Sequence, residues 1–188
     1  MILALYSIDM PTIILDRDGV INVDSEDYIK SPDEWRPIDG SLIAIAKLKT
    51  AGYQIAVATN QSGLGRGLFS QASLYAIHRK MILESKEMGG EFDMIAFCPH
   101  HPDVNCECRK PKTGLLQAIN AKLPLNADTD WLVGDTGKDL EAGQRMGIRA
   151  ALVETGKGKQ EITKGIVSRE TTPIFRNLAH FTSWLLNI

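Results

Sequence analysis

The chain has 188 residues, of which 44% are hydrophobic and 23% are charged, and its formal net charge is −2. This length and composition indicate one globular domain with a full core, and the near-neutral charge gives no basic surface for nucleic acid. No apolar run is long enough to cross a bilayer, so we expect a cytoplasmic protein without a membrane partner. The first ten residues lack the basic start and cleavage site of a signal peptide, so we interpret residues 1–10 as an N-terminal extension.

Short apolar runs alternate with helix-like periodic segments along the rest of the chain. We expect strands at 12–16, 53–59, 92–97, 130–134 and 148–153, and helices at 41–51, 70–88, 113–122, 137–146 and 176–186. Strands that are apolar on both faces and alternate with helices predict a parallel sheet with right-handed crossovers. The expected fold class is therefore α/β: a three-layer, Rossmann-like parallel sheet with helices on both faces, in a single domain over residues 1–188. The connections after the first two strands are too short for a large cap domain.

Two aspartates follow the first predicted strand, in the segment Asp16-Arg17-Asp18-Gly19. Side chains alternate faces along an extended chain, so Asp16 and Asp18 point to the same side if the backbone stays extended. Two carboxylates that close repel each other unless a cation or a shared proton relieves them, which favours a divalent metal and acid–base chemistry. The same residues also suit a plain Asp-Gly turn, so the motif alone leaves both interpretations open.

Polar residues at the ends of other predicted strands favour the functional interpretation. The carboxyl ends of parallel strands meet at one edge of the sheet, where ligands bind. Thr59, Asn60, Gln61 and Ser62 follow the second strand, and Asp135 follows the fourth. Three aspartates suit Mg²⁺, which prefers carboxylates completed by water and phosphate oxygens. The Thr59 hydroxyl and the backbone amides after Asn60 and Ser62 suit a phosphate group.

A lysine is needed to offset the negative charge at this edge. Lys110 is the best-placed candidate and Lys112 is its competitor. A carboxylate nucleophile, a metal, a hydroxyl and a lysine together indicate phosphoryl transfer through an aspartyl-phosphate. No Gly-rich loop followed by Lys-Ser or Lys-Thr occurs, so ATP use is not indicated. Asp139 lies one helical turn after Asp135 and either orients the lysine or lies on the helix surface; we favour the second interpretation.

Four potential zinc ligands fall within the segment 98–108: Cys98, His100, Cys106 and Cys108. An odd number of cysteines so tightly clustered argues against a disulfide framework and for a metal. The i, i+2 spacing within each pair lets both side chains face one centre, and three thiolates with one imidazole suit a structural, tetrahedral Zn²⁺. We therefore expect a zinc loop at 98–108 that positions the residues directly after Cys108. The neighbouring His101 would face away and is left out of the ligand set.

Four motifs resemble those of the haloacid dehalogenase superfamily of phosphatases. They are DRDGVIN at 16–22, TNQSG at 59–63, RKP at 109–111 and VGD at 133–135. The glycine-rich continuation GLGRG at 63–67 and the segments CPHHP and CECRKP in the expected zinc loop are similar, more narrowly, to the heptose-bisphosphate phosphatases. The histidinol-phosphate phosphatases are close relatives of that family. The resemblance extends from about residue 11 to residue 156.

This resemblance implies a role for each matching residue. Asp16 would be the nucleophile, and Asp18 would protonate the leaving sugar oxygen and then activate water. Thr59 and Lys110 would hold the transferring phosphoryl group, and Arg109 would contact the second phosphate or a sugar hydroxyl. The catalytic Mg²⁺ would be bound by Asp16, Asp18 through its backbone carbonyl, and Asp135. The related families also carry the same Cys-His-Cys-Cys zinc set.

The loops must supply substrate specificity, because no large cap is expected. The acidic segment 24–27 lies where the family places its substrate loop and suits sugar hydroxyls or an amine, or is simply solvated. Arg66 and Arg109 instead favour a second anionic group, although Arg66 equally suits an exposed loop. We expect a phosphatase that removes the 7-phosphate of heptose 1,7-bisphosphate, a precursor of lipopolysaccharide, with histidinol phosphate as the alternative substrate. The expected substrate-binding residues are Asp24, Ser25, Glu26, Asp27, Asn60, Gln61, Ser62, Arg66 and Arg109.

A third interpretation comes from another class of protein, a non-catalytic binding module stabilised by zinc. The complete set of polar residues at the sheet edge argues against it, and the substitution Asp16→Asn would distinguish the two, because it would abolish the activity of an enzyme. We expect a monomer whose partner is a small sugar phosphate, without nucleic acid or membrane.

Overall fold

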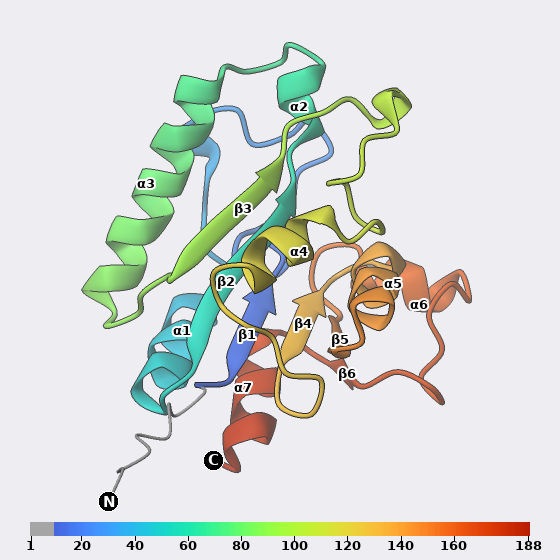
Figure 1. Cartoon of the computed structure of the whole chain (residues 1–188). Coiled ribbons are helices and arrows are strands. Elements are labelled where there is room, and N and C mark those ends of the chain that lie inside the picture. The colour runs from blue at the N-terminus through green and yellow to red at the C-terminus, as the bar shows by residue number, and fades with distance from the viewer. Residues whose placement is uncertain (1–9) are drawn as a thin grey trace, which may run out of the picture.

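The computed structural model describes residues 10–188, so the predicted N-terminal extension lies outside the described residues except for Met10. The described strands form one parallel sheet in the order β3-β2-β1-β4-β5-β6, with β1 and β4 in the middle (Figure 1). They are β1 (Thr12–Leu15), β2 (Gln54–Asn60), β3 (Met94–Cys98), β4 (Trp131–Gly134), β5 (Arg149–Val153) and β6 (Ile174–Phe175). All carboxyl ends of the strands lie at the same edge of the sheet, as a parallel sheet requires.

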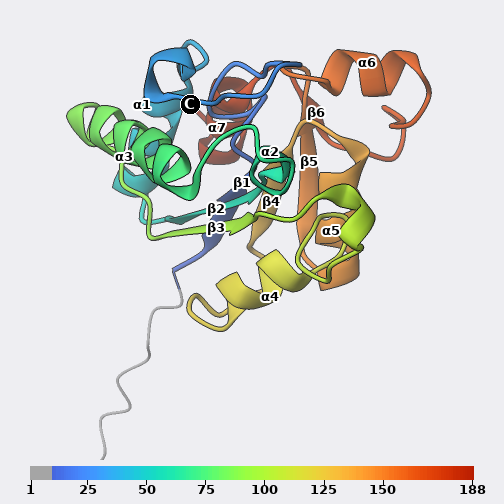
Figure 2. The same cartoon turned by 90° about the horizontal axis from the view of Figure 1, so that it is seen from above.

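Helices cover both faces of the sheet. They are α1 (Ser41–Thr50), α2 (Ser62–Gly65), α3 (Gln71–Glu87), α4 (Gly114–Asn120), α5 (Gly137–Met146), α6 (Gly158–Thr163) and α7 (Leu178–Leu186). Seen from above, α1, α3 and α7 lie on one face and α4 and α5 on the other (Figure 2). Alternation along β1 matches this arrangement, since Ile13 and Leu15 pack in the core beneath α1, α3 and α7, while Ile14 packs with α4 and α5. The predicted three-layer α/β fold is confirmed.

Among the described α-helices and strands, three were not predicted from the sequence, namely α2, α6 and β6. Each is shorter than the windows over which hydrophobic periodicity is measurable, so no pattern distinguishes it from a loop. The last helix begins at Leu178 rather than at 176, because the Asn177 side chain accepts a hydrogen bond from the His180 backbone amide at 2.9 Å and caps the helix.

The long connection between β1 and α1 is held against the core. It contains the short 3₁₀ helix η1 (Pro32–Glu34), and its apolar residues Ile21, Ile29 and Trp35 are buried. Within residues 10–188, neither this connection nor the one between β2 and β3 contains a domain-sized insertion. Among these residues, the carboxyl edge of the sheet therefore has no cap domain above it. None of the helices in this part of the chain is long and apolar enough to span a bilayer.

Candidate active site

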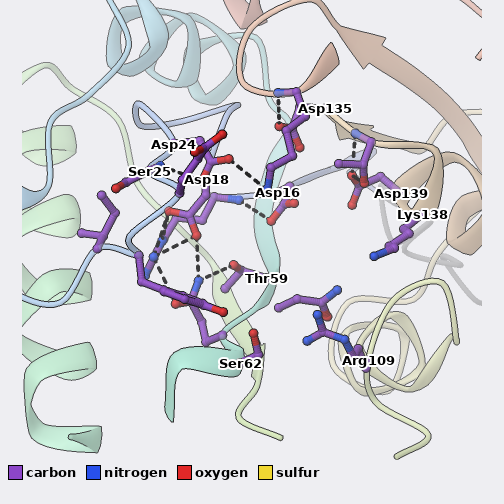
Figure 3. A pocket seen from close by; sticks show the side chains of 18 of the residues that line it. Asp16, Asp18, Asp24, Ser25, Thr59, Ser62, Arg109, Asp135, Lys138 and Asp139 are labelled. Carbon is purple, nitrogen blue, oxygen red and sulfur yellow. Dashed lines mark hydrogen bonds and ion pairs between the residues drawn. The ribbon is translucent and has the colours of Figure 1, made fainter. Parts of the chain in front are cut away.

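A cavity of about 420 Å³ lies at the carboxyl edge of the sheet, where polar side chains from the ends of β1, β2 and β4 meet (Figure 3). Two expected site residues do not line it. Asp27 lines a separate surface hollow with Tyr28 and Lys30, and Lys110 is buried beneath the cavity floor. The expected residues that do line the cavity are Asp16, Asp18, Asp24, Ser25, Glu26, Thr59, Asn60, Gln61, Ser62, Arg66, Arg109 and Asp135.

Asp16 stands at the end of β1, on the floor of the cavity. Its backbone amide donates to the Val133 carbonyl at 2.9 Å, so the ladder between β1 and β4 fixes its position. One carboxylate oxygen, Oδ2, lies 3.1 Å from Lys110 Nζ. Burial, together with the charges of Asp139 and Asp18, outweighs this lysine and raises the pKa of Asp16 to about 7. The negative charge of the Asp16 carboxylate is therefore only partly compensated by the protein.

Asp135 follows β4 and lies beside Asp16. Its Oδ2 accepts the backbone amide of Lys157 at 2.8 Å, yet burial and then the charges of Asp16 and Asp139 raise its pKa to about 8. Gly19, with φ of 82°, packs directly against it, since a Cβ at Gly19 would lie 2.2 Å from Asp135 Oδ2. Only glycine at position 19 allows the chain after Asp18 to approach Asp135 so closely.

Asp139 is fully buried, so the favoured expectation that it lies on the helix surface is wrong. Its Oδ1 lies 2.6 Å from Lys110 Nζ. Its Oδ2 accepts from the Thr136 hydroxyl at 2.7 Å and from the Thr136 backbone amide at 3.1 Å, and the amide bond is part of the capping box of α5. A Cβ at Gly134 would lie 2.2 Å from the Asp139 Cβ, so a glycine must end β4 here. Asp139 orients the lysine, which was the alternative interpretation.

Lys110 lies between three oxygen atoms and is almost completely buried. Besides the two aspartates, its Nζ donates to the Ala58 carbonyl at 2.6 Å. Burial opposes its positive charge, but Asp139 and then Asp16 outweigh burial and raise the pKa of Lys110 above its usual value. The competitor Lys112 instead pairs with Glu107 at 2.9 Å, on the surface. The geometry thus favours Lys110 as the lysine of the site.

Two amide side chains expected to bind substrate make contacts within the protein instead. Asn60 forms paired hydrogen bonds with the backbone of Lys110, donating at 3.2 Å and accepting at 3.1 Å. Gln61 donates from Nε2 to Thr59 Oγ1 at 2.8 Å and to Asp18 Oδ2 at 2.9 Å. Because the Thr59 oxygen accepts from Gln61, its hydroxyl proton remains available to donate to a ligand.

Asp18 is held by a dense set of donors. The Arg17 guanidinium donates from Nε at 3.1 Å and from Nη2 at 2.9 Å, and the Asn22 amide donates at 3.0 Å. Burial disfavours the ionised form, but Arg17 and the hydrogen bonds from Asn22 and Gln61 outweigh it and hold the pKa of Asp18 below its usual value. Asp18 is therefore a fixed carboxylate that faces the cavity.

Lys157 belongs to the site although it was not expected there. It lies in the turn after β5, lines the cavity, and its Nζ lies 3.2 Å from Asp24 Oδ2 in the acidic loop. Burial opposes its charge, and the nearby Asp24 carboxylate raises the pKa of Lys157 despite it. Asp24 is thus already paired within the protein, so its charge is not free to select an amine.

Arg109 directly follows the cysteine cluster and lines the cavity, as do Ser62 and Lys138 (Figure 3). Its Nη1 is buried and makes no hydrogen bond to any residue of the described part of the chain. A buried guanidinium nitrogen without a partner is costly, so it is suited to an anionic ligand. Arg66 lines the same cavity from an exposed position.

The four expected zinc ligands converge at the end of β3. Cys108 Sγ lies 3.1 Å from Cys98 Sγ and 3.3 Å from Cys106 Sγ, and His100 Nδ1 lies 3.2 Å from Cys108 Sγ. All four donor atoms lie within 4.8 Å of one another. Such a set fits one tetrahedral Zn²⁺. His101 Nδ1 instead accepts from the Asp103 backbone amide, in agreement with its omission from the ligand set.

The residues also fit a magnesium ion. Carboxylate oxygens of Asp16, Asp135 and Asp139 lie within 4.8 Å of one another, and Asp139 is occupied by Lys110. The raised pKa values of Asp16 and Asp135 show that the protein alone does not compensate their charge. Oxygen donors with uncompensated negative charge are what a hard divalent cation requires.

Comparison with known proteins places the chain among related sequences and structures. A family model described as HAD-hydrolase-like matches residues 107–181. A D-glycero-β-D-manno-heptose-1,7-bisphosphate 7-phosphatase from Pseudomonas putida is 50% identical over 170 residues, which cover 90% of this chain and 96% of the relative. The protein of the same name from Neisseria meningitidis serogroup A is 47% identical over 178 residues, covering 94% and 95%.

A solved structure gives the same result. The D,D-heptose 1,7-bisphosphate phosphatase from B. bronchiseptica, crystallised with magnesium and phosphate, matches with a TM-score of 0.90 and 44% identity, covering 95% of this chain and 99% of that one. Together with the family model, the fold and site define a haloacid-dehalogenase-like hydrolase. Within that class, the extent of the identity shows that the chain belongs to the D-glycero-β-D-manno-heptose-1,7-bisphosphate 7-phosphatase family. The resemblance inferred from the four sequence motifs is confirmed.

Proposed function

We propose that this protein is a Mg²⁺-dependent phosphatase that removes the 7-phosphate of D-glycero-β-D-manno-heptose 1,7-bisphosphate through an aspartyl-phosphate. One observation carries the mechanism: the Asp16 carboxylate lies on the cavity floor, 3.1 Å from the ammonium of a buried Lys110. The substrate is supported by the names of relatives that match nearly the whole chain.

In the first step, an Asp16 oxygen attacks phosphorus while the bond from phosphorus to the sugar O7 breaks. Lys110 neutralises charge on the transferring group, and the Thr59 hydroxyl donates to one of its oxygens. Asp18 gives its proton to the departing sugar oxygen. The negative charge of the bound phosphoryl group raises the proton affinity of Asp18, which counteracts the effect of Arg17 and allows Asp18 to act as an acid.

In the second step, Asp18, now ionised, removes a proton from water as that water attacks phosphorus. The bond between phosphorus and Asp16 breaks, which releases inorganic phosphate and regenerates both carboxyl groups. Asp16, Asp135 and the backbone carbonyl of Asp18 would hold the catalytic Mg²⁺. When bound, this ion offsets the carboxylate charges and polarises the phosphoryl group.

Arg109 supports a bisphosphate rather than a monophosphate amine as the substrate. The Arg109 side chain lines the cavity and its buried Nη1 has no hydrogen-bond partner among the described residues, and Arg66 and Lys138 add positive charge to the same lining. A guanidinium binds phosphate oxygens in a planar, two-pronged geometry. We assign the 1-phosphate of the substrate to this side of the cavity.

The proposal is tested by steady-state phosphate release from heptose 1,7-bisphosphate and from histidinol phosphate, with Mg²⁺ added and with Mg²⁺ removed by chelation. We expect Mg²⁺-dependent turnover and a preference of at least about 100-fold in kcat/KM for the bisphosphate, because Arg109, Arg66 and Lys138 supply positive charge for its second phosphate. Asp16→Asn should abolish turnover, whereas the matched change Asp128→Asn, at an exposed position, should have no effect. A preference for histidinol phosphate would refute the substrate assignment. Full activity of Asp16→Asn would refute the mechanism.

A further inference from the structure

The buried guanidinium of Arg17 contacts a histidine from a different element. Arg17 is 1% exposed, and it donates from Nε and Nη2 to Asp18 and from Nη2 to Gln61 Oε1 at 3.1 Å. Its remaining nitrogen, Nη1, lies 3.3 Å from Nε2 of His78, in the middle of α3. His78 thus completes the set of contacts that hold Arg17.

The chemistry of this contact defines the state of the histidine. A guanidinium has only donors, and its pKa is too high for it to lose a proton in a protein. His78 Nε2 must therefore accept, so the ring is neutral and its proton resides on Nδ1. Burial and then the Arg17 charge lower the pKa of His78 to about 4, in agreement with a neutral ring. The Phe97 ring packs edge-on against His78, with 6.0 Å between the two ring centroids, and limits rotation of the imidazole.

The contacts form one continuous path from α3 to the cavity. His78 holds Arg17, and Arg17 holds the Asp18 carboxylate, which lines the cavity. Arg17 comes shortly after β1 in the chain, and its side chain is long and flexible. The position of its guanidinium is therefore determined only by the groups that it contacts. Loss of the acceptor on α3 would leave a buried N–H without a partner and let the guanidinium move, and Asp18 would move with it.

We propose that His78 is a positioning residue for the acid–base step, acting through Arg17 to hold Asp18 in line with the leaving oxygen. The proposal rests on the role assigned to Asp18 in the proposed function. It does not require His78 to touch the substrate or to exchange a proton.

The test uses the dependence of the reaction on its leaving group. A sugar alkoxide needs a proton to depart, whereas nitrophenolate leaves as a stable anion and needs little help from an acid. kcat/KM reports events up to departure of the leaving group, so it isolates this step. A residue that acts through Asp18 should therefore matter for heptose 1,7-bisphosphate and matter little for p-nitrophenyl phosphate. A purely structural defect should lower both values alike.

Three variants separate the acceptor from the bulk of the ring. His78→Gln can place Oε1 where Nε2 stood, His78→Asn is polar but too short, and His78→Leu fills the space without an acceptor. For the sugar phosphate we expect kcat/KM to fall about 10- to 100-fold in the Leu and Asn variants and by less than about threefold in the Gln variant. For the aryl phosphate all three should stay within about threefold of the unmodified protein. His180→Gln, at an exposed histidine, is the matched control.

Several results would overturn the proposal. Equal losses on both phosphates would show that His78 is only structural. Unchanged kcat/KM in folded Leu and Asn variants, or failure of the Gln variant to recover, would show that the acceptor is irrelevant. If the Leu variant does not fold, the comparison of Gln with Asn decides. Failure of the unmodified protein to hydrolyse the sugar phosphate would instead refute the proposed function.

Discussion

Lys110 is the residue on which the charges of the site converge. Its ammonium lies between Asp16 and Asp139, at 3.1 and 2.6 Å, and the lysine is only 1% exposed. A charge that is buried with two opposite charges is stable only as a complete set, because removing one member leaves the others uncompensated. The close approach of Gly134 to Asp139 allows Asp139 to reach this lysine, and the pair determines where the lysine places its charge.

Replacement of Asp139 should therefore affect both stability and catalysis. We expect Asp139→Asn to lower the free energy of unfolding by about 3 kcal/mol and to lower kcat at least about tenfold, because Lys110 loses its shorter ion pair and is less well oriented. Chemical denaturation and steady-state kinetics measure the two effects. Asp128→Asn, on the surface, serves as the control. A variant with unchanged stability and kcat would show that the buried pair has no role.

The raised pKa values of Asp16 and Asp135 predict how the metal-free protein responds to pH. Their pKa values of about 7 and about 8 exceed the ordinary aspartate pKa of 3.8 expected for the unfolded chain, so the folded protein binds more protons between these limits. The free energy of unfolding of the metal-free protein should thus decrease as the pH rises from about 4 to about 8. Bound Mg²⁺ requires the ionised carboxylates, so its affinity should increase over the upper part of this range.

Calorimetric titration and thermal unfolding test this linkage. Between about pH 6 and pH 8.5 we expect the Kd for Mg²⁺ to fall at least about tenfold, and the rise of Tm with Mg²⁺ to be larger at the higher pH. Asp16→Asn removes one of the two titrating groups and should flatten the dependence. An affinity for Mg²⁺ that does not change with pH would contradict the assignment of these carboxylates.

Among the elements, the cysteine cluster and the cations Arg109 and Lys110 lie on one continuous segment. Cys108 is followed directly by Arg109 and Lys110, and the Lys110 backbone is held on its other side by Asn60. A metal at the cysteine cluster would fix this otherwise irregular segment. The loop would thereby place the charge of Lys110 beneath the cavity and the charge of Arg109 beside it.

Loss of one zinc ligand should consequently disturb catalysis without changing the nucleophile. We expect Cys106→Ser to lose bound zinc, measured by elemental analysis, and to lower kcat/KM for the bisphosphate about 10- to 100-fold. His101→Gln, which leaves the expected ligand set intact, should keep zinc. Wild-type turnover in a Cys106→Ser protein shown to lack zinc would mean that the loop does not depend on the metal.

The turn after β5 holds the acidic loop through the ion pair between Lys157 and Asp24. Because this pair is partly exposed, its contribution to stability is small, and its effect should appear in substrate binding. We expect Lys157→Met to raise KM about 3- to 10-fold with little change in kcat, and Lys159→Met, at an exposed position on the adjacent helix, to leave both unchanged. If Lys157→Met acts through Asp24, then Asp24→Asn should reproduce it and the double variant should add nothing.

For the whole molecule, the sequence predicted five of the six described strands, their layers and most of the polar residues that line the cavity, because these follow from local patterns. The alternation of Ile13, Ile14 and Leu15 between two cores is a property of any buried strand, and polar residues after parallel strands must share one edge. The predictions of chemistry also rested on local patterns, namely the spacing of Asp16 and Asp18 and that of the cysteines.

The features that the sequence did not predict depend on contacts between distant residues. Burial of the Asp139 charge requires Lys110, which comes from another loop. In the sequence, Asp139 is only a charged residue near the start of a helix, and nothing indicates this pairing. In the sequence, Arg17 is only the residue between two aspartates. Its contacts with His78 and Gln61 are visible only in the structure. Lys157 lies shortly after the end of β5, and this position was the available signal in the sequence. The short helix α6 begins directly after it, so no sequence pattern marks the turn. Such pairings are determined by the fold and not by periodicity.

The most direct test of the account is to locate the phosphoryl group on the protein during turnover. The protein is mixed with heptose 1,7-bisphosphate and Mg²⁺, quenched in acid within the first turnover, reduced with borohydride, and mapped by peptide mass spectrometry. Reduction converts an aspartyl-phosphate to homoserine, so the account predicts homoserine at position 16 and at no other aspartate. Release of phosphate in the first turnover without modification of Asp16, or with modification of a different residue, would contradict it.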